Sequence, residues 1–179
     1  MSKPAEARRS REALVALGAN LGDRLGMLRS ALEALRRTPG FEVVAVSGVY
    51  DTAPVGPPDQ PRYLNAAVAI RTELGPREVL AHLLEIERTL GRERHGTRWA
   101  ARTIDLDLIL LGECEVSEGD LQVPHPRFRE RAFVLLPLSE IAPSARDPVS
   151  GGEVSSLLRA CPGRSDAVRV GPLDDPRST

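Results

Sequence analysis

The chain has 179 residues, which is enough for one domain with a substantial hydrophobic core. Its 41% hydrophobic and 27% charged residues are ordinary for a globular protein, and no stretch approaches the roughly 20 apolar residues that a membrane-spanning helix needs. The formal net charge of −1 gives no overall attraction to nucleic acid or to an anionic membrane, so any function of the basic residues must be local.

The two ends of the chain differ in composition from its middle. Residues 1–11 are polar and basic, so we expect them to be disordered, and the short apolar run after them is not that of a signal peptide. Cys114 and Cys161 have no metal-ligand spacing, and reduced thiols are the simplest interpretation. We therefore expect a cytoplasmic protein with one domain over residues 12–162 and a polar tail over residues 163–179.

The first part of the chain predicts a strand, a helix and a second strand. The apolar run Ala13–Leu17 is typical of a short buried strand. Leucines at helical spacing predict an amphipathic helix from about Asp23 to Arg37, which Pro39-Gly40 ends. The Val-rich run Phe41–Tyr50 predicts one further strand.

A proline-rich segment, Asp51–Pro61, leads into a strand with two distinct faces. The prolines exclude a helix or a central strand, so the segment is a loop of the kind that often carries binding groups. In Tyr63–Thr72 strict alternation places Tyr63 and Asn65 on one face, together with Ala67 and Ala69, and Leu64, Ala66, Val68 and Ile70 on the other. A Tyr ring beside an amide can bind a flat heterocycle, and an edge Tyr with a structural Asn is the alternative.

The second helix and the later elements follow in order. Gly75-Pro76 opens a helix that Gly91 closes, and Glu87 lies on its apolar face, where we expect an arginine of the next loop as its partner. After the central stretch described next, the sequence predicts an edge strand within Glu113–Gln122, a short arginine-bearing helix continuing into Phe133–Leu138, a last helix within Gly151–Ala160 and a short strand at Ala167–Val170.

The stretch from Gly91 to Gly112 holds the most informative pattern. An arginine-rich segment runs directly into an apolar strand, Ile104–Leu111, which is interrupted only by Asp105 and Asp107. On a strand these carboxylates share one face, about 7 Å apart, while Ile104, Leu106, Leu108 and Leu110 line the other. Two carboxylates suit Mg²⁺, which typically takes one or two of them together with substrate phosphates, and guanidinium groups match phosphate geometry.

A structural interpretation of the same residues stays open at this point. The wet face of an antiparallel strand often carries acidic residues, and arginine-rich loops are commonly solvated surface. His125, in the rigid turn Val123–Pro126, can contact phosphate, but surface turns also carry histidines without such a role.

Four segments together resemble 6-hydroxymethyl-7,8-dihydropterin pyrophosphokinase of folate biosynthesis. They are LGANLGDR (Leu17–Arg24), YDTAPVGPPDQPRYLNAAV (Tyr50–Val68), GRERHGTRWAARTIDLDLILLG (Gly91–Gly112) and VPHPRFRERAFVLLPL (Val123–Leu138). The resemblance implies an α/β (α+β) single domain with a ferredoxin-like antiparallel sheet flanked by helices. It also implies transfer of pyrophosphate from ATP to the hydroxymethyl group of the reduced pterin, with release of AMP.

The resemblance further implies a set of site residues and partners. Asp105 and Asp107 would hold two Mg²⁺ ions, and Arg92, Arg102 and Asp107 would be catalytic. The pterin would be bound by Thr52, Pro54, Val55, Tyr63, Asn65 and Phe133. ATP would be bound by Arg94, Trp99, Arg102, His125 and Arg131. We expect a monomer that binds neither nucleic acid nor membrane.

Two rival functions make different predictions. A ligand-binding module of the same fold would bind without turnover, and Asp105 and Asp107 would be dispensable. A Mg²⁺-dependent enzyme acting on nucleic acid would bind polynucleotide in a salt-sensitive way. The net charge and the low aromatic content of 3% argue against an extended nucleic-acid track.

Overall fold

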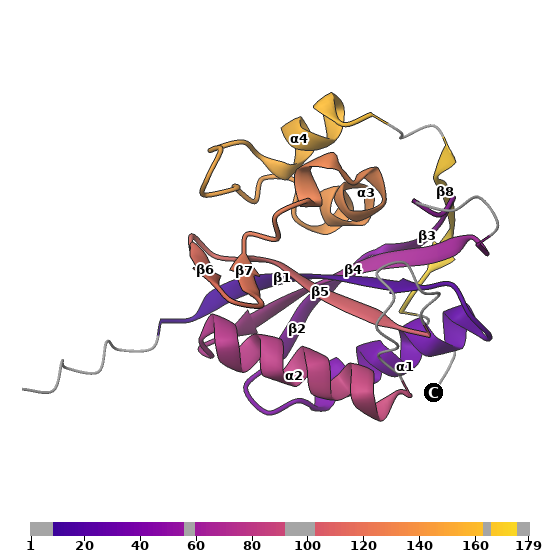
Figure 1. Ribbon diagram of the computed structural model, residues 1–179, viewed down its shortest axis with the longest axis horizontal. Coiled ribbons are helices and arrows are strands. Elements are labelled where there is room, and N and C mark those ends of the chain that lie inside the picture. Colours follow the sequence, from indigo (N-terminus) through magenta and orange to yellow (C-terminus); the bar gives the residue numbers. More distant parts are fainter. Residues whose placement is uncertain (1–8, 56–59, 92–102, 163–165, 175–179) are drawn as a thin grey trace, which may run out of the picture.

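A six-stranded antiparallel sheet lies between two layers of helices in this computed structural model (Figure 1). Residues 9–55, 60–91, 103–162 and 166–174 are described. The predicted fold class, a ferredoxin-like α+β single domain, is confirmed. None of the helices within the described ranges is long and apolar enough to cross a membrane.

The strands and helices follow the predicted order, except that two regions predicted as one strand each, Phe41–Tyr50 and Glu113–Gln122, each contribute to two strands. In chain order they are β1 (Arg11–Ala19), α1 (Arg24–Arg37), β2 (Glu42–Val46), β3 (Gly48–Thr52), β4 (Tyr63–Thr72), α2 (Pro76–Thr89), β5 (Asp105–Leu111), β6 (Val116–Glu118), β7 (Leu121–Val123), the 3-10 helix η1 (Phe128–Glu130), α3 (Ala132–Ile141), α4 (Val154–Ala160) and β8 (Val168–Pro172).

The strand order explains why the helices lie where they do. The main sheet runs β5-β1-β4-β3-β8, with β2 also paired to β4, and every pairing is antiparallel. The units β1-α1-β2 and β4-α2-β5 each step over one strand, which places α1 and α2 on the same face of the sheet (Figure 1). Strands β6 and β7 form a separate small hairpin.

Each face of the sheet has its own hydrophobic core. The core under α1 and α2 contains Leu64, Ala66, Val68 and Ile70, and the core under α3 and α4 contains Ala67 and Ala69. The alternation predicted for Tyr63–Thr72 is therefore confirmed, and Tyr63 and Asn65 lie on the α3 side.

The prediction of a single strand over Phe41–Tyr50 is wrong, because the strand is interrupted at Ser47, which separates β2 from β3. Ser47 is 2% exposed and satisfies its polar groups locally: its hydroxyl donates to Gly48 O and accepts from Ala67 N–H, and its own N–H donates to Ala67 O. The hydroxyl supplies the acceptor that the interrupted ladder lacks, so both halves remain paired with β4.

A second correction concerns the far end of β5. Leu110 was predicted to share a face with Ile104, but it packs with Ile109 in the α3-side core. Leu14 pairs with Leu110 while Val15 pairs with Leu108, so Ile109 is an extra residue, a β-bulge. The bulge reverses the alternation, and Leu111 rather than Leu110 packs on the α1 and α2 side.

Strand β8 extends the sheet beyond β3. It covers Val168–Pro172 where the sequence predicted a strand at Ala167–Val170. Gly48 pairs with Pro172 and Asp51 with Val168, so part of the polar C-terminal segment is an edge strand of the fold.

Candidate functional site

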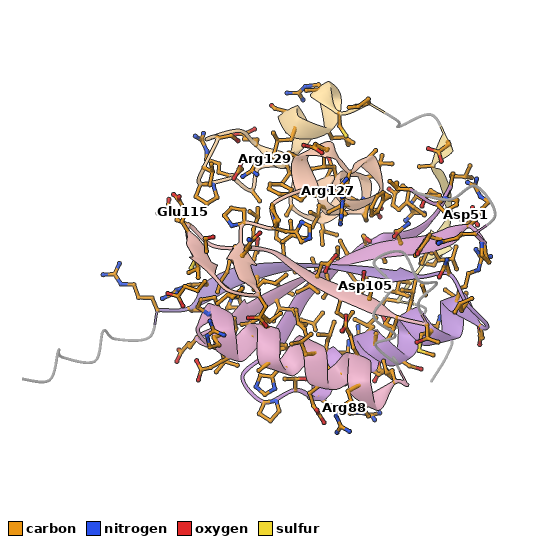
Figure 2. The ribbon with its side chains drawn as sticks, viewed as in Figure 1. Asp51, Arg88, Asp105, Glu115, Arg127 and Arg129 are labelled. Atoms are coloured by element: carbon orange, nitrogen blue, oxygen red, sulfur yellow. The ribbon has the colours of Figure 1, made fainter. Side chains whose placement is uncertain are left out.

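A cavity of about 360 Å³ opens on the α3 face of the sheet. Strands β1, β3, β4 and β5 form its floor, and the segment from His125 to Val134 forms its far wall. Figure 2 shows Asp105 on the sheet and Arg127 in the layer above it, beside α3. The lining residues are Ala16, Leu17, Gly18, Thr52, Ala53, Val55, Gln60, Tyr63, Asn65, Asp105, Asp107, His125, Pro126, Arg127, Arg131, Phe133 and Val134.

The floor is a row of residues aligned across neighbouring strands. Gly18 on β1 is paired with Asn65 on β4 and with Asp105 on β5. Two residues before Gly18 on the same strand, Ala16 pairs with Ala67 on β4 and with Asp107 on β5. Small residues on the central strand therefore leave space between an amide on one side and two carboxylates on the other.

The amide side of the cavity is fixed by a buried hydrogen bond. Asn65 Nδ2 donates to Thr52 Oγ1 at 2.7 Å, and the two residues are 5% and 4% exposed. A Cβ at Gly18 would lie 3.1 Å from Asn65 Oδ1, so glycine is needed there to leave the amide undisturbed. Tyr63 lies beside this pair and also lines the cavity.

The carboxylate side of the cavity is bordered by a guanidinium and an imidazole. Asp107 Oδ2 lies 4.0 Å from Arg131 Nη1 and 4.0 Å from His125 Nε2. The Arg131 guanidinium also lies 5.7 Å from the centre of the Phe133 ring, within the range of a cation–π contact. Because Arg131 borders the open space, its charge can act on a bound anion as well as on Asp107.

His125 is a neutral histidine held in a defined orientation. Burial, together with the nearby Arg131 charge, lowers its pKa to about 4, so the contact with Asp107 is not an ion pair at pH 7. Its Nδ1 accepts from Arg127 N–H at 3.2 Å, which leaves Nε2 as the protonated nitrogen facing Asp107. Its own N–H donates to the main-chain O of Ile109 at 2.9 Å, so the bulge in β5 anchors the turn beside the carboxylates.

Glu87 on α2 supports the strand that carries the two carboxylates. It is 2% exposed, and its Oε1 accepts from Leu106 N–H at 2.7 Å. Leu106 lies between Asp105 and Asp107, so this buried hydrogen bond fixes the main chain between the two carboxylate residues. The arginine partner predicted for Glu87 falls in the segment 92–102, outside the described residues.

The residues present suit a magnesium site that is completed by substrate. Within the described ranges, no cluster of three or more His, Cys, Asp or Glu side chains has metal-binding geometry. Among the described residues that line the cavity, Asp105 and Asp107 are the two carboxylates, and Mg²⁺ typically binds one or two carboxylates together with water and phosphate ligands.

The structure brings most of the predicted site residues to one cavity. Thr52, Val55, Tyr63, Asn65, Asp105, Asp107, His125, Arg131 and Phe133 all line it. Pro54 is described but is not among the lining residues. Arg92, Arg94, Trp99 and Arg102 lie outside the described residues.

Sequence reasoning missed eight of the lining residues, among them Gly18, Gln60 and Arg127. Gly18 directly follows the run Ala13–Leu17 that was predicted as the first strand, and its place on the floor follows from register, which no single-strand pattern contains. Gln60 stands in the segment predicted as a loop, and Arg127 stands in the short arginine-bearing helix predicted after the turn Val123–Pro126. The available signal for Arg127 was its position two residues after His125.

The sequence of this chain is similar to a known family and to solved structures. Residues 14–143 match the family described as 7,8-dihydro-6-hydroxymethylpterin-pyrophosphokinase. The 2-amino-4-hydroxy-6-hydroxymethyldihydropteridine pyrophosphokinase of Methylorubrum extorquens is 51% identical over 141 residues, covering 79% of this chain and 87% of that protein. The enzyme of the same name from Pseudomonas aeruginosa is 45% identical over 148 residues, covering 83% and 90%.

The fold also matches part of a larger solved protein. The crystal structure of wild-type Plasmodium falciparum HPPK-DHPS with pteroate superposes with a TM-score of 0.69 over 90% of this chain, at 11% identity. This chain spans 48% of that longer one, and the likeness there shows the fold alone. The family match covers most of the described domain and includes every described residue of the cavity. The chain therefore belongs to the 7,8-dihydro-6-hydroxymethylpterin-pyrophosphokinase family.

Proposed function

We propose that this protein transfers pyrophosphate from ATP to the hydroxymethyl group of 6-hydroxymethyl-7,8-dihydropterin and releases AMP, as a step of folate biosynthesis. One observation supports this most directly: a single cavity joins an amide-and-aromatic half to a half that holds two carboxylates beside cationic groups. A flat heterocycle fits the first half and a metal-bound polyphosphate fits the second. A simple ligand-binding module has no need for the second half.

The first half has the groups that a pterin ring requires. The rings of Tyr63 and Phe133 offer faces for stacking, and both line the cavity. The hydrogen bond from Asn65 Nδ2 to Thr52 fixes the orientation of the amide. Asn65 Oδ1 can therefore accept a hydrogen bond from the amino edge of the pterin. Val55 borders the same region, and we propose that Pro54 beside it helps to shape the entrance.

The second half has the groups that ATP requires. Two Mg²⁺ ions held by Asp105 and Asp107 would neutralise charge on the phosphates and orient the leaving and attacking oxygens. Arg131 supplies a guanidinium for a phosphate oxygen, and the neutral His125 supplies an Nε2–H donor. We propose the same phosphate-contacting role for Arg92, Arg94 and Arg102, with Trp99 against the nucleotide.

The reaction requires positioning rather than a covalent intermediate. The pterin hydroxyl oxygen forms a bond to the β-phosphorus while the bond from that phosphorus to the bridging oxygen on the AMP side breaks. Such transfers depend on alignment and charge neutralisation. Asp107 is the group best placed to accept a hydrogen bond from the attacking hydroxyl, whose proton must leave during the step.

A nucleotide product assay tests this function. Protein incubated with ATP, MgCl₂ and 6-hydroxymethyl-7,8-dihydropterin is expected to form AMP in step with pterin diphosphate. Asp107→Ala removes a metal-binding carboxylate, and we expect a loss of at least about 100-fold in kcat, as for other preorganised charge-stabilising groups. EDTA is expected to abolish turnover and added MgCl₂ to restore it.

Asp120→Ala is the matched control, because Asp120 is an exposed carboxylate paired with Arg77 and does not line the cavity. It is expected to leave kcat unchanged. Formation of ADP instead of AMP would mean a simple kinase and would contradict the proposal. Pterin binding without turnover would favour a binding module.

A further inference from the structure

Ala53, Val55 and Gln60, from the described parts of the loop between β3 and β4, line one side of the cavity. Both ends of this loop contact the same residue of the C-terminal segment. At the first end, Ala53 N–H donates to Asp166 Oδ2 at 2.9 Å. At the second end, Arg62 Nη2 donates to the main-chain O of Asp166 at 3.0 Å. Asp166 therefore bridges two points that are nine residues apart in the chain but adjacent across the loop.

Further contacts of Arg62 fasten the second end of the loop. Its Nε donates to Asp51 Oδ1, and its Nη2 also donates to the main-chain O of Asp51 at 3.3 Å. The main-chain O of Arg62 accepts from Arg24 Nη1 at 2.8 Å. Since ion-paired hydrogen bonds are stronger than neutral ones, the base of the loop is held from α1, β3 and the C-terminal segment together.

The two fastened ends lie directly beside the amide-and-aromatic half of the cavity. The β3–β4 ladder ends where Thr52 pairs with Tyr63, so the Ala53 N–H lies beyond the ladder and donates to Asp166 instead. Thr52, Ala53 and Tyr63 all line the cavity. A shift of either end would therefore change the spacing between the Tyr63 ring and the Asn65–Thr52 pair.

Strand β8 brings Asp166 to this position. It pairs with β3 from Gly48–Pro172 to Asp51–Val168. On the α3 side, Arg169 Nη2 donates to Glu140 Oε1 at 3.0 Å, while Tyr50 Oη donates to Glu140 Oε2 at 2.9 Å. Because β8 begins two residues after Asp166, its pairing with β3 holds Asp166 beside the loop.

We propose that Asp166 is a positioning residue for the pterin substrate, which it serves by holding the two ends of the β3–β4 loop in register. The inference rests on the proposed function and names a determinant of its pterin half. His125 and Arg131 lie on the opposite side of the cavity, so Asp166 acts on pterin recognition and not on ATP recognition.

Steady-state kinetics on a pair of variants test this role. Asp166→Ala removes the acceptor for Ala53 N–H, and we expect the KM for the pterin to rise about fivefold, the effect of one such hydrogen bond. The KM for ATP and kcat are expected to stay within about twofold. Asp166→Asn keeps a side-chain oxygen that accepts from the same N–H, so it is expected to restore the pterin KM.

Asp174→Ala is the matched control, because it deletes another exposed carboxylate of the same segment, one that pairs with Arg36 on α1 away from the cavity. It is expected to leave both KM values unchanged. Calorimetric titration with 6-hydroxymethylpterin gives the same comparison without turnover, so the positioning role can be tested even if wild-type protein forms no AMP. An unchanged pterin affinity in Asp166→Ala, or an equal loss in Asp166→Asn or Asp174→Ala, would overturn the proposal.

Discussion

Gly18 has no side chain, yet it determines what the floor of the cavity can accommodate. Its pairing with Asn65 and Asp105 places it between the two halves of the site. We expect Gly18→Ala to raise the KM for the pterin by about tenfold or more, because the new methyl group would lie 3.1 Å from Asn65 Oδ1 and would displace the amide from Thr52.

The same substitution should leave the fold intact, since the glycine is in an ordinary strand conformation and the space above it is the open cavity. Thermal unfolding measured beside the kinetics separates the two effects. A pterin KM equal to that of the wild type would contradict this prediction, because it would show that the position of the Asn65 amide does not determine the affinity for the pterin.

At the scale of elements, Glu87 connects helix α2 to strand β5. Replacement by Leu would leave the buried Leu106 N–H without its acceptor, and we expect a loss of about 1–3 kcal/mol in the free energy of unfolding. Glu87→Gln retains an oxygen for the same bond and should recover most of that stability. Urea unfolding of both variants gives the two free energies of unfolding. Equal stability of the Glu87→Leu and Glu87→Gln variants would contradict this role of the hydrogen bond.

The elements were predictable to the extent that their pattern was local. The face assignment of Tyr63–Thr72 and the helix beginning at Asp23 depend on periodicity and capping within one segment, and both agree with the structure. The division at Ser47 and the bulge at Ile109 depend instead on how a partner strand lies alongside. Such pairing is not contained in a single strand's alternation.

The site was predictable for a different reason. The composition and spacing of Asp105 and Asp107 predicted a metal-phosphate site, and the structure adds that His125 and Arg131 lie beside Asp107. The resemblance to a family supplied the pterin half. Asp166 and Gly18 contribute through register and long-range contacts, which no local motif records.

At the scale of the whole molecule, acid stability is expected to depend on Asp147. This carboxylate is fully buried and accepts from Arg129 Nε at 2.6 Å and Nη2 at 2.7 Å, and also from the hydroxyl of Ser150. Burial alone would raise its pKa, but the bonds from Arg129 and Ser150 outweigh burial and lower it from 3.8 to about 2. The ionised form is therefore the one that the fold stabilises.

Because the native pKa lies below that of the unfolded chain, this stabilisation is present above about pH 4 and is lost as the pH falls toward 2. The shift corresponds to about 2 kcal/mol at neutral pH, roughly half of which disappears between pH 5 and pH 3. Urea unfolding of wild type and Asp147→Asn should show the difference in free energy narrowing by about 1 kcal/mol over that range. A difference that is constant with pH would contradict this assignment.

The two faces of the sheet have separate consequences for engineering. No described residue of α1 or α2 lines the cavity, whereas α3 and the turn before it supply one of its walls. Stabilising substitutions commonly reduce activity when they stiffen the residues of a site. Apart from Arg24 and Glu87, which support the loop and the strand of the cavity, the helices α1 and α2 offer positions where thermostability can be raised without that trade-off.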